Sequence, residues 1–559
     1  MSIYVESPDA LDATVNFTGT NWRVRNFQVA GDDHITRLVD LDNGAGREIE
    51  YLNLGYNSVV NLTSTKFRYM SGWDGDLHDI TLGPENAWAH WMNLGALVNK
   101  VDTAVGWIGG MDIYRGRGEI TVRGGFGTMD MGELDDKIVV DGGEVFSASM
   151  QAGNDTTILR NGGRIELLND FGGNATVTVN DGSRIVNFRG GDGDVKMTLN
   201  GSGRVETAAV FNSDFTFKSA DGWTRTISGH NVASDIIVGA GGAGAIKFTA
   251  DTQQAHKMVL NGYVGTIDTT DNPTNGLDDQ RANVTVNGGA GGLYLGNGND
   301  VVQTGAVFVG VIATTGGNDI VRVGTGGSEL VSTAGGNDKV FTKAGGVSTI
   351  GTGEGTDKVY LGVGGADIVR TGEGNDLIVV REMAGTNIVS IHGGSGVDTL
   401  SFKPFKSAVT FSLDVFGQYQ NVSGAAPTDL TPAKGWFAEG GIENLIGGVK
   451  NDHLTGDSNA NRLQGGKGSD TLEGGGGDDT LFGQLGADIF VFGANSGTDT
   501  VKDYVDNVDK LRIADHSGGF KSLDISISAG DKVIIHDGGT IILDGKEGVT
   551  LTASDFDFV

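Results

Sequence analysis

Residues 465–488 read GGKGSDTLEGGGGDDTLFGQLGAD, and this stretch decides the fold because it repeats every nine residues. Asp470, Asp479 and Asp488 occupy the same position in three successive repeats. Glycine tolerates positive φ angles, so each Gly-Gly-x-Gly segment is expected to form a tight turn. A large apolar residue follows two positions after each aspartate, and a single repeat could not bury it alone. The pattern therefore predicts stacked coils of a parallel β-solenoid.

The turns between these short strands bring together oxygen atoms that suit calcium. Calcium binds about six to eight oxygens, including backbone carbonyls and carboxylates, so one turn offers roughly half of a coordination shell. The equivalent turn one coil later, 18 residues on, would supply the rest. The predicted ligand pairs are Asp452 with Asp470, Asp470 with Asp488, and Asn461 with Asp479. The glycines expected in the same sites are Gly466, Gly468, Gly475 and Gly477.

A second acidic series precedes this section and has a period of 19 residues. Half a repeat after each of its aspartates the glycine turns have mostly lost their aspartate, and only the turn at 364–367 keeps one. The spacing predicts one coil per 19 residues, with one acidic edge that binds calcium and one edge of plain glycine turns. The metal ligands predicted in this part are Asp300, Asp319, Asp338, Asp357, Asp367, Asp376 and Asp398.

Further toward the N-terminus the repeat lengthens to about 20 residues and loses its acids, as in NGGRI (161–165) and NGSGRV (200–205). These turns predict solenoid coils held by asparagine, glycine and apolar stacking rather than by many calcium ions. Charged side chains at equivalent positions are expected to form a row on one face, although a solvated strand edge is the simpler interpretation. This row consists of Glu144, Arg164, Arg184 and Arg204.

Residues 1–120 alternate like strands but show no clear period, and they contain five of the seven tryptophans. One interpretation is a carbohydrate-binding or self-association patch. The other is a hydrophobic cap over the first coil, which we favour because every solenoid requires a cap.

Composition excludes several classes of partner. The chain has 71 acidic and 40 basic residues, a formal net charge of −31, which disfavours nucleic acid and anionic membranes. There is no cysteine, hence no disulfide or thiolate site. No apolar run approaches the length of a membrane span, and the N-terminus lacks a classical signal peptide. We expect a chain that does not span a membrane and that, if exported, uses another signal.

Residues 442–492, IENLIGGVKNDHLTGDSNANRLQGGKGSDTLEGGGGDDTLFGQLGADIFVF, resemble the repeats of the RTX superfamily, the secreted Gram-negative proteins that include serralysin-type proteases. The segment GTDTVKDYVDNVDKLRI (497–513) resembles the region that closes the roll in that family. The resemblance implies a calcium-binding parallel β-roll and an uncleaved C-terminal signal read by a type I secretion machinery. It also implies a location outside a Gram-negative cell, secreted or at its surface. Asn461 departs from the aspartate that the family has at the ligand position.

The expected fold class is all-β: an elongated parallel β-solenoid or β-roll with terminal caps. Six parts are expected along the chain: an N-terminal β-rich cap or binding region (1–120), a solenoid with coils of about 20 residues (121–285), a solenoid with 19-residue calcium-binding coils (286–400), a connecting insertion (401–446), the RTX nonapeptide calcium-binding β-roll (447–492), and a C-terminal cap with the type I secretion signal (493–559).

No catalytic constellation is found in the sequence. The nine histidines do not form H-E-x-x-H, no G-x-S-x-G is present, and no long amphipathic stretch suggests a pore. We therefore expect a calcium-binding structural protein that is not an enzyme and that self-assembles, as a homo-oligomer or polymer, into a surface layer, filament or matrix. Its acidic part is expected to stay loose without calcium and to fold after export. The alternative is a protein that binds or modifies a cell-surface polysaccharide through its N-terminal half, which a row of aromatic residues along one face would favour.

Overall fold

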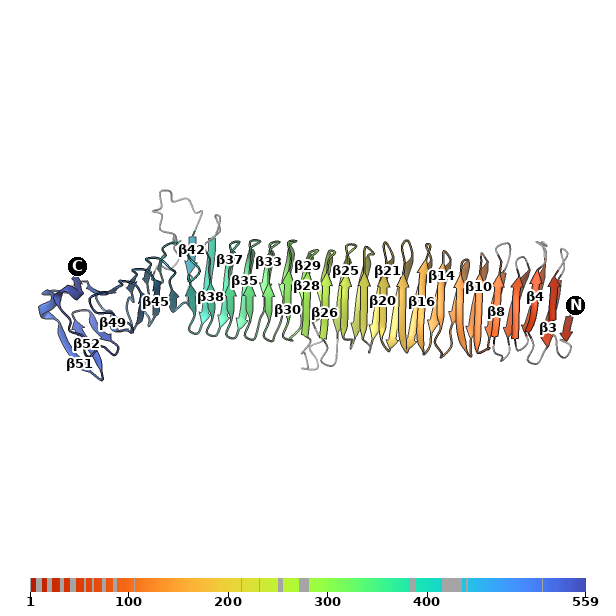
Figure 1. Cartoon of the computed structure of the whole chain (residues 1–559), viewed down its shortest axis with the longest axis horizontal. Helices are drawn as coiled ribbons and strands as arrows, with labels where there is room; N and C mark the ends of the chain where they lie inside the picture. The colour runs from red at the N-terminus through yellow and green to blue at the C-terminus, as the bar shows by residue number, and fades with distance from the viewer. Residues whose placement is uncertain are drawn as a thin grey trace. The chain divides into compact units, whose positions relative to one another are not determined.

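The computed structural model describes residues 2–6, 13–17, 23–30, 35–40, 47–54, 57–62, 65–72, 77–83, 88–104, 106–212, 214–230, 232–249, 255–270, 281–381, 388–414, 435–438, 441–514 and 516–559. In these residues the only helices are two short 3-10 turns, and all other regular structure is β-strand. The contacts divide the chain into two units, Met1–Ala290 and Gly291–Val559. Within each unit the strands follow one another as stacked coils (Figure 1). The prediction of an all-β parallel solenoid is confirmed.

In the N-terminal unit each coil contributes one strand to each of two parallel sheets. Sheet A contains β1 (Ser2–Glu6), β3 (Arg23–Ala30), β5 (Glu48–Leu54), β7 (Lys66–Gly72), β9 (Trp88–Leu94), β11 (Trp107–Ile113), β13 (Gly125–Asp130), β15 (Glu144–Met150), β17 (Arg164–Gly172), β19 (Arg184–Asp192), β21 (Arg204–Phe211), β23 (Thr224–His230), β25 (Ala243–Thr249) and β27 (Val264–Asp268). Sheet B contains β2 (Ala13–Phe17), β4 (Ile35–Asp40), β6 (Asn57–Leu62), β8 (Leu77–Leu82), β10 (Val98–Thr103), β12 (Arg117–Val122), β14 (Lys137–Asp141), β16 (Asn154–Arg160), β18 (Asn174–Val179), β20 (Val195–Leu199), β22 (Phe215–Ser219), β24 (Ser234–Val238), β26 (Ala255–Leu260) and β28 (Arg281–Val286).

The core between these sheets is built from apolar columns. Because side chains alternate along a strand, residues at every second position of each coil point inward. Val60, Ile80, Val101, Ile120 and Ile138 stand in register on β6, β8, β10, β12 and β14, and each is at most 1% exposed. A coil alone could not exclude water from its apolar side chain, so the stacking itself forms the core.

The described strands of residues 1–120 pair in parallel and continue the coils of this solenoid. Ser2 pairs with Asn26, Asn26 with Tyr51, and Tyr51 with Tyr69, all in parallel. These spacings are 24, 25 and 18 residues, because the segments between the strands differ in length. Strand pairing tolerates such differences, since loop closure becomes only slowly more costly with length. Uneven spacing explains why the sequence shows no period here.

In the C-terminal unit two parallel sheets are built from 19-residue coils, as in the pairing of Val301 with Ile320. One contains β29 (Ala290–Tyr294), β31 (Val309–Ala313), β33 (Ser328–Ser332), β35 (Val347–Glu354), β37 (Ala366–Glu373), β39 (Ile388–Ser395) and β42 (Gly435–Ala438). The other contains β30 (Val301–Thr304), β32 (Ile320–Arg322), β34 (Lys339–Phe341), β36 (Lys358–Tyr360), β38 (Leu377–Val379), β40 (Thr399–Ser401), β43 (Asn444–Ile446), β45 (Arg462–Lys467), β47 (Thr480–Leu485) and β49 (Gly497–Val501).

A β-roll with 18-residue coils follows, in which Thr471 pairs with Ile489. Its second sheet contains β41 (Thr410–Ser412), β44 (His453–Thr455), β46 (Thr471–Glu473), β48 (Ile489–Phe492), β50 (Lys510–Ile513) and β54 (Phe556–Phe558). Leu454, Leu472 and Phe490 stack inside the roll and are fully buried, as expected from the repeat. Much of the predicted connecting insertion, residues 415–434 and 439–440, lies outside the described residues.

The C-terminal residues close the end of the roll. The antiparallel strands β51 (Asp524–Ser528), β52 (Asp531–His536) and β53 (Gly539–Leu543) form a meander, and β53 pairs in parallel with β49. Ile534, Ile541 and Leu543 from this meander are fully buried. The short helices η1 (Gly519–Ser522) and η2 (Ala553–Asp555) connect the remaining strands.

Candidate metal sites

The β-roll has one acidic column along each of its two edges. On one edge the backbone N–H of Asp452 donates to Oδ1 of Asp470 at 2.7 Å, and the N–H of Asp470 donates to Oδ1 of Asp488 at 2.8 Å. On the other edge the N–H of Asn461 donates to Oδ1 of Asp479 at 2.7 Å. All three predicted pairs are therefore neighbours in adjacent coils.

Asp470 and Asp479 each use one carboxylate oxygen to accept a hydrogen bond from the neighbouring coil, and their other oxygen has no partner. The Oδ2 atoms of Asp470 and Asp479 are buried and accept no hydrogen bond. Burial raises the pKa of Asp470 to about 7 and that of Asp479 to about 6. A buried carboxylate oxygen without a partner is costly, and a cation at that oxygen would remove the cost.

The first glycine of each nonapeptide lies directly against this free oxygen, where a side chain would not fit. A Cβ added at Gly465 would lie 2.4 Å from Oδ2 of Asp470, and one added at Gly474 would lie 2.0 Å from Oδ2 of Asp479. A Cβ at Gly447 would lie 2.3 Å from the carbonyl oxygen of Gly465 as well as close to a carboxylate. Carboxylate and carbonyl oxygens, which calcium prefers, thus gather around these glycines.

The glycines that the sequence predicts in the sites form the turns between the strands. The φ angles are 108° at Gly466, 131° at Gly468, 97° at Gly475 and 94° at Gly477. These left-handed conformations turn the chain between strands, and other residues adopt them only with strain. Gln484 replaces the glycine in the third repeat and keeps a positive φ of 70°.

Two of the ligands predicted in the roll have no free carboxylate oxygen with which to bind a cation. Asp452 has both oxygens occupied, since Oδ1 accepts the N–H of Val409 at 2.7 Å and Oδ2 that of Gly448 at 2.5 Å. Asn461 carries no charge, and its Oδ1 accepts the N–H of Asp457 at 2.7 Å. The ions of the roll would depend mainly on its other aspartates and on backbone carbonyls.

The 19-residue coils also form a continuous acidic column. The backbone N–H of each aspartate donates to Oδ1 of the next aspartate at 2.7 or 2.8 Å. The Oδ2 atoms of Asp319, Asp338, Asp357, Asp376 and Asp398 are buried and accept no hydrogen bond. The column consists of Asp300, Asp319, Asp338, Asp357, Asp376 and Asp398.

This column differs from the roll at the position five residues before the aspartate. Asp398 follows a glycine, Gly393, where an added Cβ would lie 2.4 Å from its Oδ2. Asp338 and Asp357 instead follow Thr333 and Thr352 at that position. The hydroxyl of Thr333 donates to the backbone carbonyl of Thr352 at 3.3 Å, which ties adjacent coils together. A threonine side chain thus stands at the position that glycine has in the roll.

Asp367 lies apart from this column. It is the second residue of β37, is exposed, and belongs to the sheet opposite the one that β32, β34 and β36 follow. The plain glycine turns at 326–327, 345–346 and 364–365 precede the strands on that side. Its assignment as a ligand remains a prediction, without a neighbouring acidic turn to support it.

Sequence reasoning missed three further members of the acidic columns. The N–H of Asp479 donates to Oδ1 of Asp499 at 3.1 Å, and the N–H of Asp488 donates to Oδ1 of Asp509 at 2.9 Å. The N–H of Asp398 donates to Oε2 of Glu443 at 2.7 Å. The segments TDTV (498–501) and VDKL (508–511) retain an aspartate two residues before an apolar one, although their glycines are gone. That residual pattern could have identified two of the three.

The N-terminal unit contains one acidic pair of the same kind. The N–H of Asp136 donates to Oδ1 of Asp155 at 2.8 Å, and both carboxyl groups are buried. In the following coil Ala175 takes the same register position. Buried methionines, Met131 and Met150, stand five residues before these aspartates, at the position that glycine has in the roll.

No cluster of three or more histidine, aspartate or glutamate side chains that could hold a metal occurs in the described residues. A soft or tetrahedral metal needs such a cluster, whereas calcium is satisfied by carbonyl oxygens and a few carboxylates. The oxygens present fit calcium.

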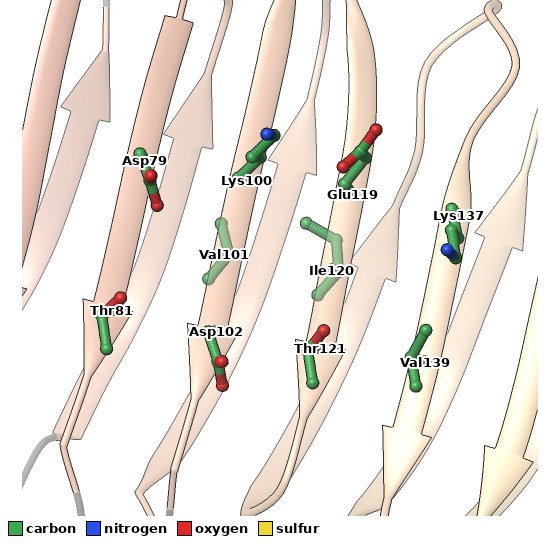
Figure 2. Close-up of a pocket in the computed structure, with 10 residues that line it drawn as sticks. All are labelled: Asp79, Thr81, Lys100, Val101, Asp102, Glu119, Ile120, Thr121, Lys137 and Val139. Atoms are coloured by element: carbon green, nitrogen blue, oxygen red, sulfur yellow. The ribbon is translucent and has the colours of Figure 1, made fainter.

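The N-terminal unit also has two polar surfaces. The predicted row of Glu144, Arg164, Arg184 and Arg204 is present, in register on consecutive strands, and Arg164 contacts Glu144 at 3.3 Å. A shallow hollow of about 260 Å³ lies on sheet B, where oppositely charged side chains alternate from strand to strand (Figure 2). The charged residues of the hollow are Asp79, Lys100, Asp102, Glu119 and Lys137.

Comparisons with known proteins agree with the geometry of the C-terminal unit. The profile of the RTX calcium-binding nonapeptide repeat matches residues 361–379, 437–472, 455–490 and 464–501. A search of curated proteins gives no match. Among solved structures, extracellular lipase LipA from Serratia marcescens is similar at 15% identity and a TM-score of 0.16, over 47% of this chain and 45% of the lipase chain. That likeness is too low to support any inference about activity.

Among the residues that the structure describes, no helix has the length and apolarity needed to cross a membrane. Three of the four repeat matches lie over the roll, where a glycine stands five residues before Asp452, Asn461, Asp470, Asp479 and Asp488. The chain therefore carries RTX calcium-binding nonapeptide repeats in its C-terminal unit.

Proposed function

We propose that the protein is a secreted, calcium-stabilised β-solenoid that serves as a building block of an extracellular layer, filament or matrix. The observation that carries the proposal is the pair of acidic columns in the roll, in which the buried Oδ2 atoms of Asp470 and Asp479 accept no hydrogen bond. Such columns belong to a scaffold that calcium completes, and repeated coils make up most of the described chain.

Calcium would act as a folding switch for the roll. Binding that occurs only in the folded state contributes about 2.7 kcal/mol per site at a hundredfold excess of calcium over Kd. Several sites together would decide whether the roll folds. The chain would then pass through a type I secretion machinery unfolded, where calcium is scarce, and fold outside a Gram-negative cell. Its C-terminal segment would carry the secretion signal.

Assembly would use the exposed turns of the C-terminal unit. Val397 and Val449 lie in turns beside the acidic columns and Leu485 ends β47, and they are 53%, 40% and 65% exposed. Exposed apolar side chains favour lateral contact between copies. Because calcium orders these turns, it would also order the surface that they present.

Electron microscopy of the purified chain, first in chelator and then in millimolar calcium, tests the proposal. Ordered sheets or filaments that appear only with calcium are expected. A variant with Asp470→Asn and Asp479→Asn should require more calcium to form them, whereas Asp367→Asn should assemble like the wild type. Well-folded single particles at every calcium concentration would refute self-assembly, while leaving calcium binding itself intact.

A further inference from the structure

A line of aromatic side chains crosses the outer face of sheet A in the N-terminal unit. Tyr51, Tyr69 and Trp91 occupy the same register on β5, β7 and β9. The rings of Tyr51 and Tyr69 stack at 5.2 Å with an interplanar angle of 15°. Tyr51 and Trp91 are each 40% exposed. Trp107 on the next strand, β11, is 47% exposed but lies three residues out of this register, because Gly110 is the residue that pairs with Trp91. The uneven spacing of these residues in the sequence concealed the line.

Glycines on the following strands make room for the two indoles. Gly110 pairs with Trp91, and a Cβ at Gly110 would lie 2.2 Å from Cζ3 of that indole. Gly125 pairs with Trp107, and a Cβ there would lie 2.2 Å from Cε3. Each indole thus extends over a glycine of the next strand. The protein backbone supports the rings, which stay ordered at the surface.

A row of hydrogen-bonding side chains runs beside the aromatic line, two residues further along each strand. The hydroxyl of Ser71 donates to Oδ1 of Asn53 at 2.6 Å. Every member of the row is at least partly exposed, so each can reach a ligand that lies on the rings. The row consists of Asn53, Ser71, Asn93, Asp112 and Asp130, in register on β5, β7, β9, β11 and β13.

The combination of these two rows identifies the ligand chemistry. Pyranose rings present C–H faces that stack on the negative faces of aromatic rings, and their hydroxyls need donors and acceptors at the side. An apolar protein partner would instead need a contiguous apolar patch, which the polar row interrupts. Neighbouring strands lie about 4.8 Å apart, close to the length of one sugar unit. A glycan that crosses the strands could therefore place successive sugars on successive rings.

We propose that the aromatic line of Tyr51, Tyr69 and Trp91 is a binding platform for an uncharged pyranose polysaccharide. Asp112 and Asp130 at its edge accept hydrogen bonds from hydroxyls and repel a polyanion. The site is independent of the calcium columns and of self-assembly. It would attach the protein, or the material it forms, to a glycan surface.

Affinity electrophoresis of the full chain in calcium tests the platform, with hydroxyethylcellulose, dextran or polygalacturonate in the gel. Retardation by at least one neutral polymer is expected, and polygalacturonate should have less effect. Tyr69→Ala and Trp91→Ala should each weaken the retardation at least tenfold in apparent Kd. Phe211→Ala, which removes an exposed ring elsewhere on sheet A, is the matched control and should bind like the wild type.

Thermal unfolding and circular dichroism of each variant establish that the coils remain folded. If Trp91→Ala does not fold, Tyr51→Ala replaces it, because that ring stacks on Tyr69 in the same register. Unchanged binding by folded Tyr69 and Trp91 variants would overturn the proposal. So would a wild-type chain that none of the polymers retards, or one that only polygalacturonate retards.

Discussion

The residue five positions before each aspartate governs what the acidic columns can hold. Where it is glycine, as at Gly465 and Gly474, a free carboxylate oxygen lies against the backbone. Where it is threonine, as at Thr333, a side chain stands at that position and bonds to the next coil. The residue at this position therefore separates coils with backbone beside the carboxylate from coils that are held by their own hydroxyls.

Gly465→Ala should weaken calcium binding without straining the backbone, because Gly465 does not have a positive φ. Its new Cβ would lie 2.4 Å from Oδ2 of Asp470. We expect the calcium-dependent gain in stability to fall by about 1–3 kcal/mol, the contribution of roughly one site. The measurement is a calcium titration by calorimetry together with unfolding in calcium and in chelator.

Gly493→Ala provides the control for this substitution, since an added Cβ there has no neighbour within 4 Å. Its calcium titration should match that of the wild type. Equal behaviour of the two alanine variants would mean that the surroundings of Gly465 are not part of a calcium site.

The buried pair Asp136 and Asp155 predicts a pH dependence in the N-terminal unit. Burial raises the pKa of Asp136 to about 7 and that of Asp155 to about 6, from 3.8. Between pH 4 and 7 the folded chain keeps protons that the unfolded chain loses, so its stability falls as pH rises through this window. Below pH 4 the raised pKa values contribute their full stabilisation, and above pH 7 the stability no longer falls with pH.

Hydrogen exchange of the coils around β14 and β16 should therefore show less protection at pH 8 than at pH 5, after correction for the intrinsic rate. Asp136→Asn together with Asp155→Asn should flatten this dependence, because an amide does not titrate. If the protection of these coils in the wild type instead rose with pH, the raised pKa values of Asp136 and Asp155 would be contradicted.

At the scale of elements, the C-terminal meander shields the last coil of the roll. β53 continues the parallel sheet beyond β49, and β52 and β51 then turn antiparallel. An uncovered terminal coil would expose its apolar face and a row of unpaired backbone groups. The meander converts that end into a surface with buried aliphatic side chains beneath it.

Two adjacent isoleucines of β52 differ in burial, so their substitution tests whether this strand covers the roll. Ile534 is fully buried, whereas Ile535 is 46% exposed. Ile534→Ala should lower the free energy of unfolding by about 2–5 kcal/mol, and Ile535→Ala should change it by less than about 1 kcal/mol. Urea unfolding in calcium, followed by tyrosine and tryptophan fluorescence, measures both. Similar losses for the two variants would show that β52 does not cover the roll as described.

At the scale of the whole molecule, acids and apolar residues share one structural position in different coils. In the N-terminal unit the inward position at the start of the sheet B strands passes from Asp155 to Ala175, Val195 and Phe215. In the C-terminal unit the equivalent column is acidic. The same coil geometry is therefore stabilised by apolar contact in one part and depends on charge neutralisation in the other.

Removal of calcium should accordingly affect one part of the chain. In chelator we expect hydrogen-exchange protection of residues 447–492 to be lost, while residues 144–249 keep theirs. The physical reason is that the roll must bury unpaired carboxylate oxygens, whereas the coils around Ala175 and Val195 bury methyl groups at that position. Exchange mass spectrometry of the full chain resolves the two regions. Equal protection of both regions in chelator would exclude calcium as a folding switch.

The sequence by itself determined the coil length of the acidic parts, the inward apolar positions and the pairing of aspartates 18 or 19 residues apart. It could do so because these features repeat locally, and a constant spacing fixes the register of stacked strands. Asp470 and Asp488 are neighbours for that reason alone.

Only the tertiary structure decided which oxygens remain free, which of them lie against glycine backbone, and which side chains meet where the spacing is uneven. Tyr51, Tyr69 and Trp91 are 18 and 22 residues apart, yet they share one register because the intervening loops absorb the difference. Asp367 follows a glycine turn in the sequence but lies on the sheet opposite the acidic column. Strand pairing acts between coils through backbone hydrogen bonds, so loops of unequal length can still bring distant side chains into one line.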